Sequence, residues 1–188
     1  HHQITKSIKE INSLKNLIYV HAKFVVPKFP KKNFRNYKKY GGGCLLDMGP
    51  YAAAIFRIFL NQNSKKVIFF KSSQQNKVGL NTNFNIYIYA NGKVFFGYFS
   101  HDGEYENTLT LLTKRKKVTI NRVFSPPNDK NLILQVNDGY VKKEKKLEKD
   151  DVFLNYFKSI FILLKNKKFE SSYKNLLNDS FFREQLTK

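Results

Sequence analysis

Three consecutive glycines, Gly41, Gly42 and Gly43, lead into an apolar segment that ends at Leu60. Consecutive glycines allow positive φ angles and a close approach of the backbone to a ligand. The apolar residues from Ala52 to Leu60 are typical of a buried helix. We therefore predict a glycine loop that feeds a buried helix, and this pattern constrains the rest of the fold more than any other part of the sequence.

Asp47 and Tyr51 lie four residues apart at the start of this predicted helix. Residues four apart share a helix face, so their side chains can act on the same substrate atom. A carboxylate beside a phenol suits proton transfer to or from a carbonyl or hydroxyl oxygen. A structural interpretation stays open, in which Asp47 caps the helix and Tyr51 packs in the core. In either interpretation, Pro50 must lie in the first turn of the helix or kink the helix at Gly49.

The segment from Gly41 to Tyr51 resembles the G-G-G-x-L-x-D-x-G-x-(His/Tyr) signature of one family's C-terminal domain. The family is that of the glucose-fructose oxidoreductase, inositol dehydrogenase and rhizopine-catabolism (Gfo/Idh/MocA) oxidoreductases. Only this signature is specific, but the likeness covers nearly the whole chain. The other similar segments are His1-His2-Gln3, Leu17 to Pro27, Phe34-Arg35, Glu104 to Leu112, Val118 to Ile120, Phe124 to Pro127, Phe153 to Leu164 and Tyr173 to Leu186.

The resemblance implies a role for each residue of the signature. Tyr51 would be the acid/base catalyst, Asp47 would orient the reacting groups, and Gly41, Gly42 and Gly43 would lie against the cofactor. The intact enzyme would use NAD or NADP to act on a sugar or sugar derivative. It would form a homodimer through the open face of its sheet.

Two family motifs are absent from the sequence. The chain contains no G-x-G-x-x-G dinucleotide fingerprint and no Glu-Lys-Pro segment, whose lysine is catalytic in the family. We therefore expect residues 1–188 to form a single C-terminal substrate-binding and oligomerisation domain that lacks the N-terminal Rossmann domain. Such a chain would bind no cofactor and show no turnover alone.

Arg35 belongs to a long basic loop, residues 28–43, that connects a strand to the glycines. A long connection inside a compact domain is more often functional than accidental. Arg35 is therefore a candidate for binding a carboxylate or phosphate of the substrate, with an exposed loop cation as the alternative.

The formal net charge of +20 requires a second hypothesis, that of a non-catalytic basic binding or assembly module, either a nucleic-acid binder or a degenerate structural relative of such an enzyme. The runs Lys114-Arg115-Lys116-Lys117 and Lys142-Lys143-Glu144-Lys145-Lys146 are candidate phosphate contacts. However, only five of the 34 basic residues are arginine, the residue that base recognition and bidentate phosphate binding favour. We therefore rank nucleic acid below an anionic substrate.

Several other classes receive no support from the sequence. The single cysteine, Cys44, forms no intramolecular disulfide and is predicted to be a small buried residue rather than a nucleophile. The four histidines show no metal-ligand spacing. No apolar stretch approaches the roughly 18 to 20 residues of a membrane span. We therefore expect a cytoplasmic protein.

The remaining sequence predicts an α+β domain with an open, largely antiparallel sheet of six or more strands and helices packed on one face. An opening helix runs from Ile4 to about Asn16, and two closing helices begin near Asp150-Asp151 and Tyr173, the first with a core-facing stripe from Phe153 to Leu164. Asn91-Gly92 predicts a tight hairpin. The predicted strands are residues 17–26, 66–74, 83–90, 94–100, 108–112, 117–121, 132–136 and 140–143.

Overall fold

The first strand of the chain, β1 (Leu17–Val25), lies near the centre of a single sheet in the computed structural model, which describes residues 2–60 and 67–187. Across these residues the sheet has eight strands in the order β2-β3-β4-β1-β5-β6-β7-β8. The other strands are β2 (Val67–Gln75), β3 (Asn81–Ala90), β4 (Lys93–Ser100), β5 (Glu106–Thr113), β6 (Lys116–Asn121), β7 (Ile133–Asp138) and β8 (Val141–Lys146).

The pairing of these strands is antiparallel except between β1 and β4, which run parallel. The predicted open, largely antiparallel α+β sheet is therefore confirmed. Asn91 and Gly92 both have positive φ angles and close the β3–β4 hairpin, as their sequence predicts. His1 and Lys66, the first residue of one predicted strand, lie outside the described residues.

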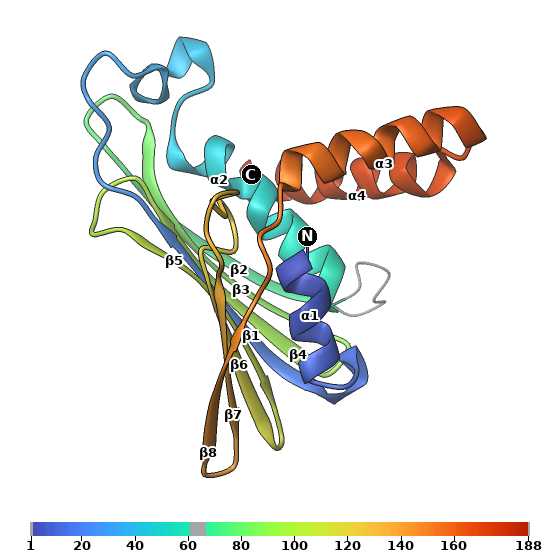
Figure 1. The fold of residues 1–188 in the computed structure, drawn as a ribbon. Helices are drawn as coiled ribbons and strands as arrows, with labels where there is room; N and C mark the ends of the chain where they lie inside the picture. The colour runs from blue at the N-terminus through green and yellow to red at the C-terminus, as the bar shows by residue number, and fades with distance from the viewer. Residues whose placement is uncertain (1, 61–66, 188) are drawn as a thin grey trace.

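Two helices cover one face of the sheet, as predicted. Helix α1 (His2–Glu10) contacts β6 and β7, whereas α2 (Cys44–Ile55) contacts β3 and β4 and continues into a π-helical turn, Phe56–Leu60. Figure 1 shows both helices on the same side of the sheet. Alternate residues of the central strands, such as Ile86, Ile88, Phe95 and Phe99, are fully buried beneath them.

Two local predictions differ from the structure. Helix α1 ends at Glu10 rather than near Asn16, because Asn12 adopts a left-handed backbone with φ of 66°. Residues 14–16 form a separate 3-10 turn. The loop 28–43 also contains two 3-10 turns, Phe34–Asn36 and Lys38–Tyr40, so it is more ordered than the sequence suggests.

The prediction that the stripe on the first closing helix is core is wrong. Helix α3 (Val152–Asn166) buries none of its residues, and Phe153 is 77% exposed. Helix α4 (Glu170–Thr187) buries only Phe182 and Leu186, near its C-terminal end, where it contacts α2. In Figure 1 both helices extend away from the sheet, so within residues 2–60 and 67–187 the stripe of α3 does not face the core.

The second face of the sheet carries aromatic and aliphatic side chains without a covering helix. Tyr87 is paired with Phe96, and Phe96 with His21, across three neighbouring strands. Tyr87 and Tyr89 are exposed to about the same degree, at 37% and 40%. Among the described residues, this face is therefore the more exposed side of the sheet.

One helical stretch, Lys38–Leu60, is long and apolar enough to cross a membrane by length and composition alone, contrary to the expectation from sequence. Its most apolar 18-residue window is 61% buried inside the domain. The stretch contains α2, the helix that packs on β3 and β4, so its apolar character is that of a core helix.

Candidate active site

The glycine loop is held by its own backbone hydrogen bonds. The amides of Gly41, Gly42 and Gly43 donate to the carbonyls of Lys38, Tyr37 and Arg35 at 3.0, 3.1 and 3.0 Å, respectively. A Cβ on Gly42 would lie 2.5 Å from the Arg35 carbonyl oxygen, closer than packing permits. Gly43 has a φ of 104° and is the N-cap of α2. The glycines therefore fold the loop back over Arg35 at the entrance to the helix.

Asp47 lies in the first turn of α2 and binds two partners from distant parts of the chain. Its Oδ2 accepts a hydrogen bond from Arg35 Nε at 2.8 Å and lies 3.1 Å from His101 Nε2. Arg35 comes from the first 3-10 turn of the loop, and His101 follows the end of β4. Phe29 contacts both partners, with its ring edge-on to His101 and 5.0 Å from the Arg35 guanidinium carbon. The result is an Arg35–Asp47–His101 cluster.

The cluster keeps Asp47 ionised. Burial raises the pKa of the Asp47 carboxyl, but hydrogen bonds from His101 and Arg35, together with their charges, outweigh that effect and leave the pKa below its usual value. Asp47 is thus held in the first turn by two side chains and is not the cap of the helix. The N-cap residue of α2 is Gly43.

Tyr51 lies one turn further along α2, and its ring packs against Phe24 and Phe124 with centroid distances of 5.3 Å to each, while those two rings stack on each other. Pro50 lies inside the helix rather than in its first turn. The side chain of Tyr51 is half buried and lines a cavity of about 480 Å³ between α1 and α2. Burial raises the pKa of the phenol, the charge of Asp47 raises it further, and that of Arg35 lowers it. Asp47 and Tyr51 therefore lie one turn apart on α2, and the charge of Asp47 acts on the phenol.

Cys44 lies at the start of α2 and is fully buried. Its thiol contacts the Met48 sulfur at 3.7 Å. Burial, followed by the charge of Asp47, raises the pKa of the thiol far above its usual value. A buried, protonated thiol of this kind is inert, which agrees with the predicted small core residue. Among the residues that the structure describes, no three His, Cys, Asp or Glu side chains gather into a group that could hold a metal ion.

A family model of the GFO/IDH/MocA C-terminal domain matches residues 7–118. The chain belongs to the Gfo/Idh/MocA family. The resemblance carried by the glycine signature is therefore confirmed. The match includes the whole Arg35–Asp47–His101 cluster and Tyr51.

The names of several relatives of this Gfo/Idh/MocA domain describe enzymes that act on sugars. A dTDP-3,4-didehydro-2,6-dideoxy-alpha-D-glucose 3-reductase from Saccharopolyspora spinosa is 23% identical over 154 residues, which are 80% of this chain and 45% of the relative. The chain thus spans about half the length of the relatives that it matches.

Solved structures share the fold of this Gfo/Idh/MocA domain. A 3-ketoreductase from Actinomadura kijaniata, in complex with NADP and TDP-benzene, superimposes with a TM-score of 0.85 at 19% identity over 97% of this chain and 57% of its own. A UDP-N-acetylglucosamine 3-dehydrogenase from Acidithiobacillus ferrooxidans gives a TM-score of 0.65 at 9% identity over 89% of this chain and 50% of its own. At these identities the likeness shows the fold alone.

His101 is a member of the site of this Gfo/Idh/MocA domain that was not predicted from the sequence. The residue is only 8% exposed, and it reaches Asp47 because β1 and β4 run parallel and end at the same edge of the sheet. A Ser-His-Asp run directly after a predicted strand was the available signal. The roles proposed for Asp47, Tyr51, Arg35 and the glycines remain predictions; the structure brings Asp47 and Arg35 into contact and places Tyr51 one turn further along α2.

Proposed function

We propose that this chain is the substrate-binding and dimerisation domain of an NAD(P)-dependent oxidoreductase that acts on a sugar or sugar derivative. The observation that carries the proposal is the half-buried Tyr51 phenol, one turn from an ionised Asp47 at the position where the family signature has His or Tyr. The names of the relatives, a 3-ketoreductase and a 3-reductase, support a carbonyl on a sugar ring as the reacting group.

Tyr51 has the protonation state that a carbonyl reduction requires. Because its pKa is raised by burial and by Asp47, the phenol is neutral near pH 7 and can donate a proton. A nicotinamide cofactor, when bound, supplies hydride to a carbonyl carbon. Tyr51 would donate its proton to the carbonyl oxygen of the sugar. The reverse reaction would need a tyrosinate, which the same surroundings disfavour.

Asp47 acts in this proposal as a positioning residue. Its carboxylate is already bound by Arg35 and His101, so it fixes the loop and the end of β4 to the first turn of α2, one turn before Tyr51. Arg35 uses only its Nε for this bond. Within the described residues its two Nη groups make no hydrogen bond, and its side chain is 29% exposed. They are therefore available to bind a carboxylate or phosphate of the substrate.

The glycine loop does not offer its backbone amides to a cofactor phosphate. Backbone amides hold phosphate only when they are free to donate to it, and those of Gly41, Gly42 and Gly43 already donate within the loop. A cofactor contact by these glycines would therefore have to use their Cα surface. In our proposal a domain outside these 188 residues holds NAD or NADP, and this chain alone does not turn over.

The dimer that we propose is formed by the open face of the sheet. Its side chains include Tyr19, His21, Tyr87, Tyr89, Phe96, Tyr98 and Leu112. His21 Nε2 is buried and has no hydrogen-bond partner among the described residues. A second copy packed on this face would cover the aromatic rings and could donate the missing bond.

The enzymatic proposal is tested with the longest protein that the gene encodes. We expect it to oxidise NADPH or NADH in the presence of a sugar nucleotide that carries a 3-keto group. Tyr51→Phe should lower kcat about 100-fold or more while leaving cofactor binding unchanged. A Tyr51→Phe enzyme with full activity, or an intact protein that binds no nicotinamide cofactor, would overturn the proposal.

The dimer is tested by sedimentation of the chain at micromolar concentration. We expect a dimer that Tyr87→Lys converts to a monomer, because a lysine in the centre of the contact would be buried without a partner. Val78→Lys is the matched control, since Val78 lies in the β2–β3 turn and is 69% exposed. A monomeric wild type, or the same effect from both variants, would exclude dimerisation through this face.

A further inference from the structure

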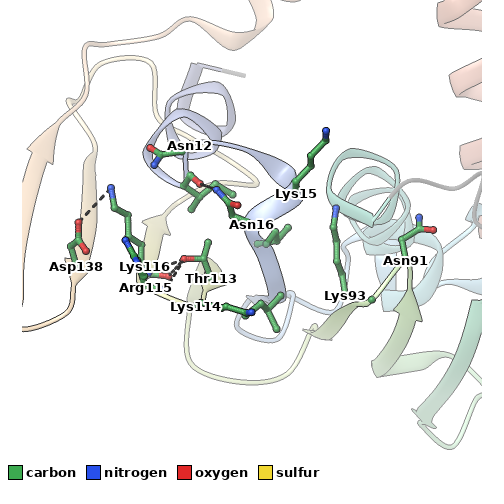
Figure 2. Close-up of a pocket in the computed structure, with 14 residues that line it drawn as sticks. Asn12, Lys15, Asn16, Asn91, Lys93, Thr113, Lys114, Arg115, Lys116 and Asp138 are labelled. Atoms are coloured by element: carbon green, nitrogen blue, oxygen red, sulfur yellow. Dashed lines mark hydrogen bonds and ion pairs between the residues drawn. The ribbon is translucent and has the colours of Figure 1, made fainter.

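A cavity of about 790 Å³ lies where three turns meet at one end of the sheet. Its walls come from the segment between α1 and β1, the β3–β4 turn and the β5–β6 turn (Figure 2). A volume of this size falls within the range of about 300 to 1,000 Å³ that is usual for small-molecule sites. The cavity is therefore large enough for a ligand of the size of a nucleotide.

Positive charge dominates the lining of the cavity. The cationic side chains are Lys15, Lys93, Lys114, Arg115 and Lys116, and the single carboxylate is that of Asp138. Asp138 pairs with Lys116 at 3.5 Å. Among the described residues, the side chains of Lys15, Lys114 and Arg115 make no ion pair or hydrogen bond. A concave surface with one predominant sign of charge concentrates its potential and attracts anions.

The cations of the cavity lie on opposite sides of it. Figure 2 shows Lys15 and Lys93 on the side of the Asn91 turn, and Arg115 and Lys116 on the other side, beside Asp138. Thr113 Oγ1 accepts hydrogen bonds from the amides of Arg115 and Lys116 at 3.2 and 2.8 Å, which fixes the β5–β6 turn. The backbone that carries Arg115 and Lys116 is therefore preorganised, although the side chains of Lys15, Lys114 and Arg115 are exposed.

Lys93 is partly enclosed at the wall formed by the β3–β4 turn. Its Nζ donates a hydrogen bond to the Phe59 carbonyl at 3.0 Å, and burial lowers its pKa. An anion in the cavity would compensate the ammonium for lost solvent. The same residue also ties the β3–β4 turn to the end of the α2 segment, so the wall of the cavity is continuous with the core.

We propose that this cavity binds a small anion that carries two or more phosphate groups. Several cations on facing walls favour a ligand with more than one anionic group over a single carboxylate. Lysines predominate, and a lysine acts as a point charge rather than as a planar fork. The site should therefore select by charge and size, with inorganic triphosphate and nucleoside di- or triphosphates as suitable ligands. A concave cavity of this volume fits such a molecule better than it fits a nucleic acid duplex, whose phosphates extend along a much longer surface.

This site is separate from the candidate active site. β1 begins at the cavity, where Leu17 contributes to its lining, and runs for nine residues to the edge near His101. At about 3.3 Å per residue the two ends lie roughly 25 Å apart. A ligand in the cavity cannot reach Tyr51, so the inference does not depend on the proposed oxidoreductase function.

The test is calorimetric titration of the chain with inorganic triphosphate in about 0.15 M salt, where interactions of scattered surface charges are largely screened. The cavity variant is Lys114→Gln/Arg115→Gln, and the matched control is Lys165→Gln/Lys174→Gln. The control removes the same charge from exposed positions on α3 and α4. We expect saturable binding to one site, weakened about tenfold or more in the cavity variant and changed less than about twofold in the control.

Thermal unfolding of each variant checks that the fold is intact, and Lys15→Gln serves as the cavity variant if the double substitution unfolds the chain. Absence of saturable binding by the wild type would overturn the proposal. Equal weakening in the cavity variant and the control would also overturn it, because binding would then follow bulk charge. The proposal fails as well if duplex DNA binds equally well to all three proteins and displaces the triphosphate.

Discussion

Arg35 Nε donates a hydrogen bond to Asp47 Oδ2 at 2.8 Å and thereby joins the loop to the first turn of α2. The two side chains are 29% and 25% exposed, so water screens this pair only in part. His101 reaches the same oxygen from the end of β4. One carboxylate therefore connects the loop, the helix and the sheet.

Asp47→Asn should lower the free energy of unfolding by about 1 to 2 kcal/mol, because it removes the charge that Arg35 and His101 share. Urea denaturation of wild type and variant measures the difference. Asp129→Asn is the control, since Asp129 lies in an exposed loop. Equal midpoints for wild type and Asp47→Asn would mean that the cluster does not stabilise the fold.

The contribution of Asp47 to stability should disappear in acid. Its carboxyl has a lower pKa in the folded chain than in the unfolded chain, where the value is about 3.9. The stabilisation is therefore fully present above that value and is lost as the pH falls through the folded pKa. The difference between wild type and Asp47→Asn should be constant from pH 7 to about 5 and shrink below about 4. A difference that grows in acid would show that the sign of the shift is wrong.

Gly42→Ala should destabilise the chain by about 2 to 4 kcal/mol, because its new methyl group would overlap the Arg35 and Tyr37 carbonyl oxygens. Gly79→Ala is the matched control, since Gly79 has a positive φ but open space around its Cβ position. There we expect only the backbone cost of about 1 kcal/mol. Thermal melts distinguish the two, and a smaller loss for Gly42→Ala than for Gly79→Ala would refute the close packing of the loop.

Cys44 should not react with a thiol reagent in the folded chain. Burial raises the pKa of its thiol and shields it from solvent. We expect modification only on addition of denaturant, at a rate that follows unfolding. Rapid labelling under native conditions would show that the thiol is at the surface and would contradict its burial against Met48 at the start of α2.

The sequence predicted the strands well because alternating apolar residues and turn residues are local signals. Asn91-Gly92 is the clearest case, since the turn specifies both its backbone and the pairing of the strands on either side. It did not predict that β1 pairs with β4, because no local pattern encodes a partner so far along the chain. His101 was missed for the same reason.

The error at α3 has a different physical origin. Its apolar spacing correctly indicated a helix and the residues that share a face, such as Phe153 and Phe157. Periodicity shows which side chains face the same way but says nothing about what lies opposite them. Helical spacing was enough to predict that Asp47 and Tyr51 lie one turn apart, because both residues belong to the same helix.

The central position of β1 also has a consequence during protein synthesis. Its neighbours on both sides, β4 and β5, belong to residues 93–113, so the first strand leaves the ribosome long before either partner exists. At usual rates of translation the delay is several seconds. Throughout that time the apolar side chains of β1, among them Val20 and Phe24, have no sheet to join. Contacts this distant in sequence also slow folding. The nascent chain is therefore an expected client of chaperones.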